Sequence, residues 1–418
     1  MYSHILLDAF FVLSVSLIWF MLGYQTLLFF LGDRYYRKVR HADAGSDPVA
    51  DRDLPHVSVL VPCHNEERVI AATIRSLLSL DYPPEKLEVV VINDGSTDRT
   101  SVIAGSFAGS RVSVVEVPLE AAARGKASAL NIGLRHARHE VLAIYDADNT
   151  PEPGALRPLV GELVRDPGLG AAIGIYRAVN RHKNLLTRFL NIESISFQWI
   201  LQAGRWMLMH LATLPGTNYV IRRSLVESLG GWDEAALTED AELTLRIYRA
   251  GSRIKFVPSS VTWEQEPQTL RVWLRQRNRW VRGHNYLLRK YAGGLLSMKP
   301  RRIGLELLYS LWLYYVFFVA ILLSDLLFVL GVVGVVRIAV PGPYTAVWGF
   351  AYVTFVLQLI ISLAREREED TPKNILLVMV MYFTYCQLWI PVVARAFYDD
   401  FIARRPLKWA KTERFEVS

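Results

Sequence analysis

Two aspartates, one residue apart, end a hydrophobic stretch in "VLAIYDADNTPEP" (141–153). Side chains two residues apart in a strand project to the same face, so Asp146 and Asp148 can reach one ligand. Pro151 and Pro153 then end the strand. Both acids are left at its carboxyl end, where open α/β sheets place their ligands. A solvated turn would use the same residue types, so the assignment depends on what else converges there.

The elements that would position this pair are typical of an α/β domain. Four runs rich in β-branched residues predict strands, at 57–61, 87–92, 112–117 and 140–145. Helical patterns separate them, near 66–80, 98–106 and 126–137. Because the strands lack polar alternation, we expect a parallel sheet covered on both faces. This layout predicts a nucleotide-binding domain.

Further polar clusters follow the predicted strands. "PCHNEE" (62–67) follows the first and "NDGSTD" (93–98) the second, while "TED" (238–240) lies further along the chain. A single cluster of this kind is usually a loop. Because three of the four clusters stand at carboxyl ends of one predicted sheet, we expect them to line a single rim.

The residue types at this rim suit a metal-bound diphosphate. Mg²⁺ or Mn²⁺ prefers carboxylate oxygens and takes one or two protein carboxylates plus substrate phosphates. Asp94 suits a base or ribose, and Asp240 is the candidate general base. The alternative for "TED" is a helix start capped by Thr238. "AAARGKASAL" (121–130) does not match a P-loop, although Lys126 could reach a phosphate or be a solvated lysine.

An Arg- and Trp-rich segment follows, "WLRQRNRWVRG" (273–283). By itself it could be an interfacial helix, with Trp at headgroup depth and Arg reaching outward.

The motifs together resemble a known family. "DGS" with Asp94, "DAD" with Asp146 and Asp148, "PGTNYVIRR" (215–223), "TED" with Asp240 and the Q-x-x-R-W segment at 276–280 occur in that family's order. The chain resembles the membrane-embedded family-2 glycosyltransferases, the group of cellulose, hyaluronan, chitin and poly-N-acetylglucosamine synthases. The resemblance covers roughly residues 55–290. In architecture the chain is most similar to the poly-N-acetylglucosamine synthases.

The resemblance implies a GT-A-type fold, a UDP-sugar donor, Mg²⁺ or Mn²⁺, and inverting, processive synthesis of a β-linked polysaccharide without a covalent intermediate. Asp240 would be the catalytic base. Predicted donor-binding residues are Pro62, Asn65, Glu66, Asp94, Lys126, Asp146, Gln276 and Arg279. Predicted acceptor-binding residues are Gly216, Thr217, Asn218, Glu239 and Trp280. Asp148, with Asp146, would hold the metal.

The substrates and the class of protein stay open in part. UDP-N-acetylglucosamine is expected ahead of UDP-glucose, and the acceptor would be a growing polysaccharide. One alternative is a single transfer to a lipid acceptor. A different class is a transporter with a nucleotide-sensing domain, although charges within the apolar segments are few.

The composition predicts a membrane protein. It is 52% hydrophobic with a mean hydropathy of +0.21, and residues 9–32 are uncharged and long enough to cross a bilayer. A basic cluster follows, which places the next segment in the cytoplasm. At least three further spans are expected in 303–398, where the count for 303–336 stays open. Three would leave the basic C-terminal tail outside, although its charges favour the inside.

The predicted parts are these: span 1–33, linker 34–54, GT-A-type catalytic domain 55–268, amphipathic interfacial helices 269–302, spans 303–398 and basic tail 399–418.

Two cysteines give no disulfide framework, and the histidines show no spacing typical of metal ligands. The net charge is +7, but no basic stripe of the kind that binds nucleic acid is present in the sequence, so nucleic acid is not an expected partner. The expected location is the cell (inner) membrane, with lipids and a small accessory membrane subunit as candidate partners.

Overall fold

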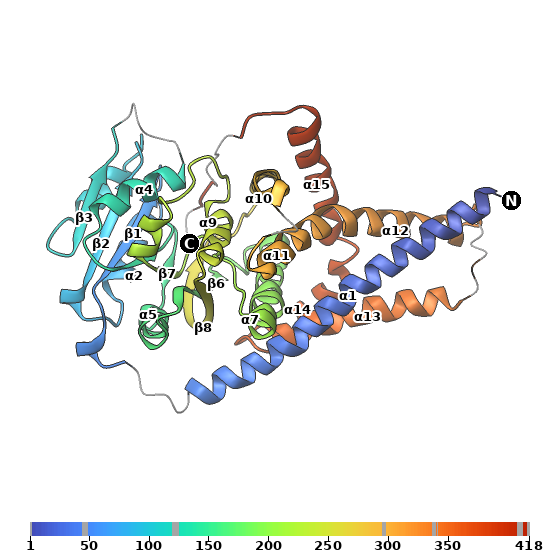
Figure 1. The fold of residues 1–418 in the computed structure, drawn as a ribbon, viewed down its shortest axis with the longest axis horizontal. Helices are drawn as coiled ribbons and strands as arrows, with labels where there is room; N and C mark the ends of the chain where they lie inside the picture. The colour runs from blue at the N-terminus through green and yellow to red at the C-terminus, as the bar shows by residue number, and fades with distance from the viewer. Residues whose placement is uncertain are drawn as a thin grey trace.

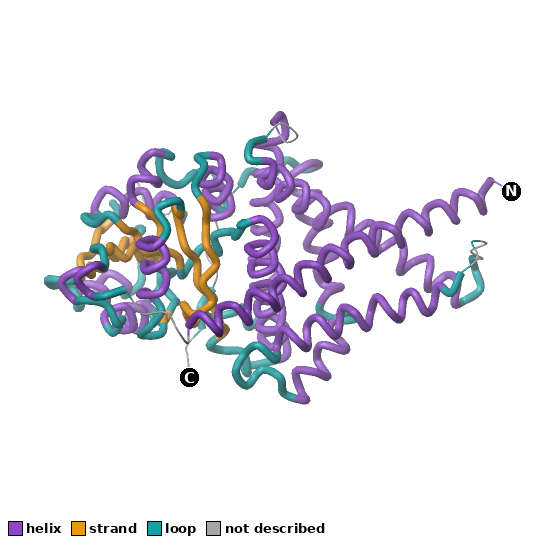
Figure 2. The backbone as a smooth tube through the Cα atoms, turned by 60° about the horizontal axis from the view of Figure 1, so that its bottom comes forward, coloured by secondary structure: helices purple, strands orange, loops and turns teal. Residues whose placement is uncertain are grey.

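The computed structural model describes residues 2–43, 49–118, 125–294, 298–336, 340, 342–407 and 413–415. An α/β domain forms one end of the molecule, and long helices extend from it to the other end (Figures 1 and 2). The N-terminus lies at the far tip of this helical extension, whereas the C-terminus lies back beside the α/β domain (Figure 1).

The domain is built on an eight-stranded sheet in the order β3-β2-β1-β4-β7-β6-β8-β5. Its first half consists of β1 (Val57–Cys63), β2 (Leu87–Asn93), β3 (Val112–Glu116) and β4 (Val141–Ile144). These four strands are parallel, and β1 and β2 are buried along their whole length. The four predicted strands and their parallel arrangement are therefore confirmed.

The second half of the sheet is mixed. It contains β5 (Thr150–Pro151), β6 (Leu169–Ala178), β7 (Tyr219–Arg222) and β8 (Arg253–Glu264). β7 is antiparallel to both β4 and β6, and β5 is antiparallel to β8, whereas β6 and β8 are parallel. The expected parallel arrangement therefore describes the four predicted strands, and the sequence made no prediction for the strands of this mixed half.

Helices cover the sheet and continue toward the extension. The predicted ones are α2 (Ile70–Leu78), α3 (Thr100–Gly105) and α4 (Lys126–His136), joined by α5 (Leu156–Arg165) and α8 (Arg223–Ser228). A helical run formed by α6 (Leu185–Ser196), a π-helical turn (Phe197–Gln202) and α7 (Ala203–Met209) packs against α1 (Tyr2–Asp43). The helices that matter most for the site are α9 (Glu239–Arg249) and α10 (Leu270–Tyr291).

Within the described residues, three helices are long and apolar enough to cross a membrane, at Leu6–His41, Arg301–Gly331 and Ala346–Leu363. The second joins α11 (Arg301–Leu311), a π-helical turn (Trp312–Phe317) and α12 (Phe318–Val332), so residues 301–331 form one continuous helix. The third lies within α13 (Tyr344–Leu363). A fourth candidate is broken: α14 (Pro372–Met381) and the helical segment 386–402, which includes α15 (Trp389–Phe397), meet at a bend of 44°.

Candidate active site

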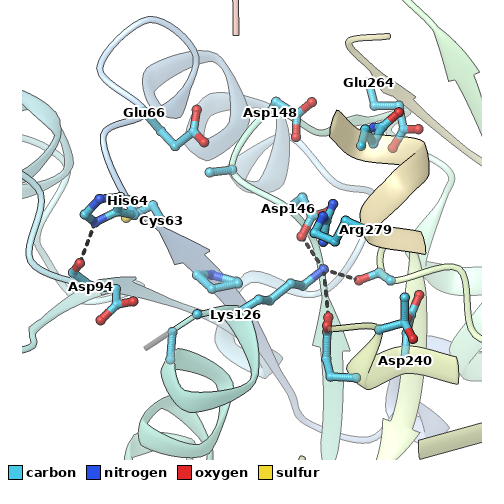
Figure 3. A pocket seen from close by; sticks show the side chains of 18 of the residues that line it. Cys63, His64, Glu66, Asp94, Lys126, Asp146, Asp148, Asp240, Glu264 and Arg279 are labelled. Carbon is cyan, nitrogen blue, oxygen red and sulfur yellow. Dashed lines mark hydrogen bonds and ion pairs between the residues drawn. The ribbon is translucent and has the colours of Figure 1, made fainter. Parts of the chain in front are cut away.

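A cleft opens at the carboxyl ends of β1, β2 and β4 (Figure 3). All four polar clusters that the sequence singles out contribute to its wall, together with α10. The predicted site residues that line it are Pro62, Glu66, Asp94, Lys126, Asp146, Asp148, Gly216, Glu239, Asp240, Gln276, Arg279 and Trp280. The expectation that three strand ends share one rim is therefore confirmed.

Lys126, the first residue of α4, reaches into the middle of the cleft (Figure 3). Its ammonium group donates a 2.7 Å hydrogen bond to the carbonyl oxygen of Gly216, pairs with Asp146 and lies 3.7 Å from Oε1 of Glu239. Burial alone would lower the pKa of Lys126, but the surrounding carboxylates outweigh it and raise the pKa. The alternative of a solvated lysine is wrong, because its side chain is only 16% exposed.

Gly216 separates Lys126 from Asp240. Its φ of +89° lies in the left-handed region that favours glycine. A Cβ at this position would lie 3.2 Å from Oδ2 of Asp240 and 3.5 Å from Nζ of Lys126. The glycine therefore lets backbone pass between a cation and an acid that both face the cleft.

Three predicted binding residues do not line the cleft. The Thr217 hydroxyl donates a 2.7 Å hydrogen bond to Oδ1 of Asn149, and the Asn218 amide donates a 2.9 Å bond to a carbonyl of β6. The Asn65 side-chain oxygen accepts a 2.7 Å bond from the backbone N–H of Thr97. All three residues hold loops around the cleft in place, and direct substrate contact stays a prediction for them.

Asp148 lies at a second acidic position of the cleft. One carboxylate oxygen accepts a 3.2 Å hydrogen bond from the backbone N–H of Gln265, and the other lies 3.0 Å from Nη2 of Arg414. Burial raises the pKa of Asp148, whereas Arg414 opposes that rise. Glu264 lines the same wall, and burial together with neighbouring acids raises its pKa well above the ordinary value.

Glu239 and Asp240 form the first turn of α9. Burial raises the pKa of Asp240, with Lys126 as the main opposing charge, and burial also raises the pKa of Glu239. A raised pKa makes a carboxylate a better proton acceptor, as a general base requires. Thr238 occupies the capping position, but its side chain makes no cap hydrogen bond, so the alternative of a threonine cap is wrong.

The Q-x-x-R-W segment lies in α10, whose first turn is capped by Thr269. Residues at helical positions i, i+3 and i+4 share one face, so Gln276, Arg279 and Trp280 all face the cleft. Oε1 of Gln276 is buried without a hydrogen-bond partner among the described residues. A buried acceptor of this kind is normally satisfied, and it points to a ligand that donates.

Trp280 is held by a stacked arginine. The Arg277 guanidinium lies 4.0 Å from the centroid of the Trp280 ring, and its Nη2 lies 2.6 Å from a carboxylate oxygen of Glu193. An aromatic ring fixed in this way presents its other surface as a rigid platform. Trp280 lines the cleft. This position does not fit the alternative in which its ring serves only as a membrane anchor.

Close packing joins α10 to α9. A Cβ at Gly283 would lie 2.5 Å from Cγ2 of Thr238 and closer still to its Oγ1. This contact brings the Q-x-x-R-W face against the "TED" turn, and only a glycine allows it at this distance.

Among the lining residues that the sequence-based list missed, three have acidic or basic side chains: His64, Glu264 and Arg414. Nδ1 of His64 lies 2.7 Å from the carbonyl oxygen of Asp94. His64 stands inside the "PCHNEE" cluster, so the signal for it was present. Glu264 is the last residue of β8, a strand that was not predicted, and nothing in the sequence separates Arg414 from the other basic residues of the tail.

The acids of the cleft fit a hard divalent cation. The described residues contain no group of three or more His, Cys, Asp or Glu side chains that could hold a metal by themselves. Mg²⁺ and Mn²⁺ do not need such a group when substrate phosphates complete their coordination. Asp148 already holds a cationic group at Oδ1, the guanidinium of Arg414, which occupies the position of a positive ion there.

The chain is similar to proteins that transfer sugars. The family model described as "Glycosyltransferase like family 2" matches residues 55–283. The "Probable glycosyltransferase YdaM" of Bacillus subtilis (strain 168) is 41% identical over 411 residues, which cover 97% of each chain. The "Poly-beta-1,6-N-acetyl-D-glucosamine synthase" of Staphylococcus aureus is 29% identical over 303 residues, which cover 70% of this chain and 72% of that protein.

A solved structure shares the fold. The mannosyltransferase PcManGT from Pyrobaculum calidifontis, in complex with GDP-Man and Mn²⁺, superposes with a TM-score of 0.64 at 22% identity. The superposition covers 96% of this chain and all of that one. The α/β domain therefore has the GT-A-type fold.

Proposed function

The chain belongs to the family described as glycosyltransferase like family 2, and we propose that it extends a β-linked polysaccharide from a UDP-sugar by inverting transfer in this cleft. The observation that carries the proposal is the convergence of Asp94, Asp148, Asp240 and Arg279 on one cleft. These residues come from two strand ends and two helices. Such convergence is what a donor, its diphosphate and an acceptor hydroxyl would need.

Asp240 is the proposed base. Its carboxylate would accept the proton of the acceptor hydroxyl as that oxygen attacks the anomeric carbon. Burial raises its pKa, which favours proton uptake, while Lys126 keeps the ionised form accessible. Because the attack and the loss of the diphosphate take place in one displacement, the sugar inverts and no sugar–enzyme bond forms.

The donor diphosphate would lie between positive and acidic groups. Lys126 and Arg279 supply fixed positive charge for it. Asp148, with Asp146 nearby, would hold Mg²⁺ or Mn²⁺, which neutralises the charge of the departing diphosphate. PcManGT, which shares the fold, is bound to Mn²⁺, and this supports a divalent cation here.

UDP-N-acetylglucosamine is the proposed sugar donor. The support is the 29% identity with a poly-β-1,6-N-acetyl-D-glucosamine synthase over 70% of the chain. UDP-glucose and, because PcManGT binds GDP-Man, a GDP-sugar are the competing donors. A processive enzyme must keep its acceptor while the nucleotide leaves, and the rigid ring of Trp280 suits that task.

The proposed membrane arrangement has three spans. α11 begins on the side of the catalytic domain, since Arg205 pairs with Glu306 at 2.9 Å. α13 ends on that same side, since Nε of Arg177 donates a 2.8 Å bond to Glu366. The helices α12 and α13 thus extend away together and return (Figure 1). With α1 they would cross the membrane, and the basic residues after α1 place the catalytic domain in the cytoplasm.

The broken helical pair would not cross. Trp389 of the second half donates a 3.1 Å bond to Glu193, and Asn374 of the first half accepts a 3.2 Å bond from Arg188. Both partners lie on α6 of the catalytic domain, so the pair enters and leaves on one side. The tail then stays with the catalytic domain, where its basic residues are expected.

A donor panel tests the proposed function. The full-length protein in detergent is incubated with Mn²⁺ and UDP-N-acetylglucosamine, UDP-glucose or GDP-mannose, and nucleoside diphosphate release and product mass are measured. We expect long products from UDP-N-acetylglucosamine and none from Asp240→Asn. The matched control Asp166→Asn removes a carboxylate that pairs with Arg253 outside the cleft and should be fully active. A product of one added sugar would favour the lipid acceptor, and turnover of another donor would overturn the donor assignment.

A further inference from the structure

Arg414, in the short described segment 413–415, lines the cleft. Residues 413–415 are held by Gln265, whose side chain accepts a 2.9 Å hydrogen bond from the Phe415 N–H and donates a 2.7 Å bond to the Phe415 carbonyl. Arg68 donates a 3.2 Å bond to the carbonyl oxygen of Arg414. Two separate parts of the catalytic domain therefore fix this short segment from its backbone, whatever its side chains do.

The side chain of Arg414 forms an ion pair with Asp148. Nη2 lies 3.0 Å from Oδ1 of Asp148, and Nη1 donates a 3.1 Å bond to the carbonyl oxygen of Gln265. The backbone N–H of Gln265 binds the other oxygen of Asp148. Both carboxylate oxygens of Asp148 are thus engaged, Oδ1 by Arg414 and Oδ2 by the backbone of Gln265.

We propose that Arg414 and the divalent cation compete for Asp148, so that the Arg414 side chain closes the metal site until metal and donor displace it. The inference rests on the proposed function, in which Asp148 is the metal ligand. A guanidinium and a divalent ion on one oxygen would repel each other strongly in so buried a place. A buried carboxylate also needs a cation when no metal is bound, and Arg414 supplies it.

The other cations of the cleft are not placed to do this. Lys126 pairs with Asp146 and lies near Glu239, on the side of the cleft away from Asp148 (Figure 3). Arg414 alone among the described basic side chains has an ion pair with Asp148. Removing the charge of Arg414 should therefore raise the metal affinity, whereas removing a metal- or donor-binding residue should lower it.

Mn²⁺ affinity measures the competition directly. Mn²⁺ binding to the full-length protein in detergent, without donor, is followed by electron paramagnetic resonance. Arg414→Gln should bind Mn²⁺ about tenfold more tightly than the wild type, within the roughly 5- to 150-fold range usual for coupled sites, and Arg414→Lys should stay near the wild type. Arg404→Gln, which changes an exposed arginine of the same tail, is the matched control and should change nothing.

A second readout follows the tail itself. Hydrogen exchange at the Phe415 amide, which is protected by Gln265, should become faster when Mn²⁺ and UDP are added. Unchanged Mn²⁺ affinity in Arg414→Gln, with binding lost in Asp148→Asn, would overturn the competition and leave the metal site intact. Mn²⁺ binding that survives Asp148→Asn, or fails in every variant, would overturn the metal assignment and the competition together.

Discussion

Replacing Gly283 with alanine should displace α10 from the first turn of α9, which carries the proposed base Asp240. The added Cβ would lie 2.5 Å from Cγ2 of Thr238, whereas ordinary contact begins at 3.4 Å. One of the two backbones must therefore move by about 1 Å. A displacement of this size in a positioned catalytic group can cost about 10²-fold in rate, and overpacking of this kind costs about 1–3 kcal/mol of stability.

The assay is nucleoside diphosphate release by the full-length protein, with the thermal midpoint recorded in parallel. Gly283→Ala should lose about 10²-fold in turnover and remain folded. The matched control is Gly105→Ala in α3, where nothing lies within 4 Å of the added Cβ, and it should behave as the wild type.

A second-site change sharpens the test. Thr238→Ala removes the two atoms nearest to the new Cβ, so that of the three nearest atoms only the Cβ of residue 238 remains, at 2.9 Å. The double variant should therefore recover part of the lost turnover. Full activity of Gly283→Ala, or a double variant slower than the single one, would refute the reasoning that this contact sets the position of Arg279 and Trp280.

Three further outcomes are expected. Asp240→Asn should lower turnover by at least about 10²-fold with little change in donor binding measured by calorimetry, and weakened binding at unchanged turnover would show a binding residue instead. Because burial raises the pKa of Asp240, and the base must be ionised, the rate should fall on acidification at a higher pH than for an ordinary aspartate; a rate that is flat down to the ordinary pKa would contradict this. Trp280→Ala should nearly stop elongation in a product-size assay while UDP binding persists, Trp280→Phe should retain part of it, and long polymer from the alanine variant would contradict the platform role.

Much of this site was predictable because its acids follow regular strands. Asp94 and the Asp146–Asp148 pair stand directly after β-branched runs, and parallel strands bring their carboxyl ends to one edge. The sequence also predicted the fold of the catalytic domain through the order of its motifs. It could not show that Asn218 bonds within the sheet, because an exposed loop and a buried turn use the same residue types.

The number of spans and the place of the tail were beyond the sequence for a different reason. Hydropathy measures how apolar a segment is, and Leu376 or Trp389 contributes the same amount in a span or in a helix packed on a domain. The contacts of the broken pair with Glu193 and Arg188 support the proposal that it packs on the domain. Likewise, the charge of Arg414 is visible in the sequence, but its pairing with Asp148 is a contact between distant parts of the chain.

The reversal of strand direction explains how the cleft acquires its second wall. β7 runs antiparallel to β4, with Tyr219 paired to Ile144, so the start of β7 lies at the edge where β4 ends. The loop before β7 therefore delivers Gly216 beside Lys126 and Asp240. β6 reverses direction again and β8 runs parallel to it, so β8 also ends at this edge and carries Glu264 there. A wholly parallel sheet would have placed the start of β7 at the opposite edge, away from the carboxyl ends of β1, β2 and β4. The mixed half of the sheet thus adds a second wall to the rim that we propose binds the donor nucleotide.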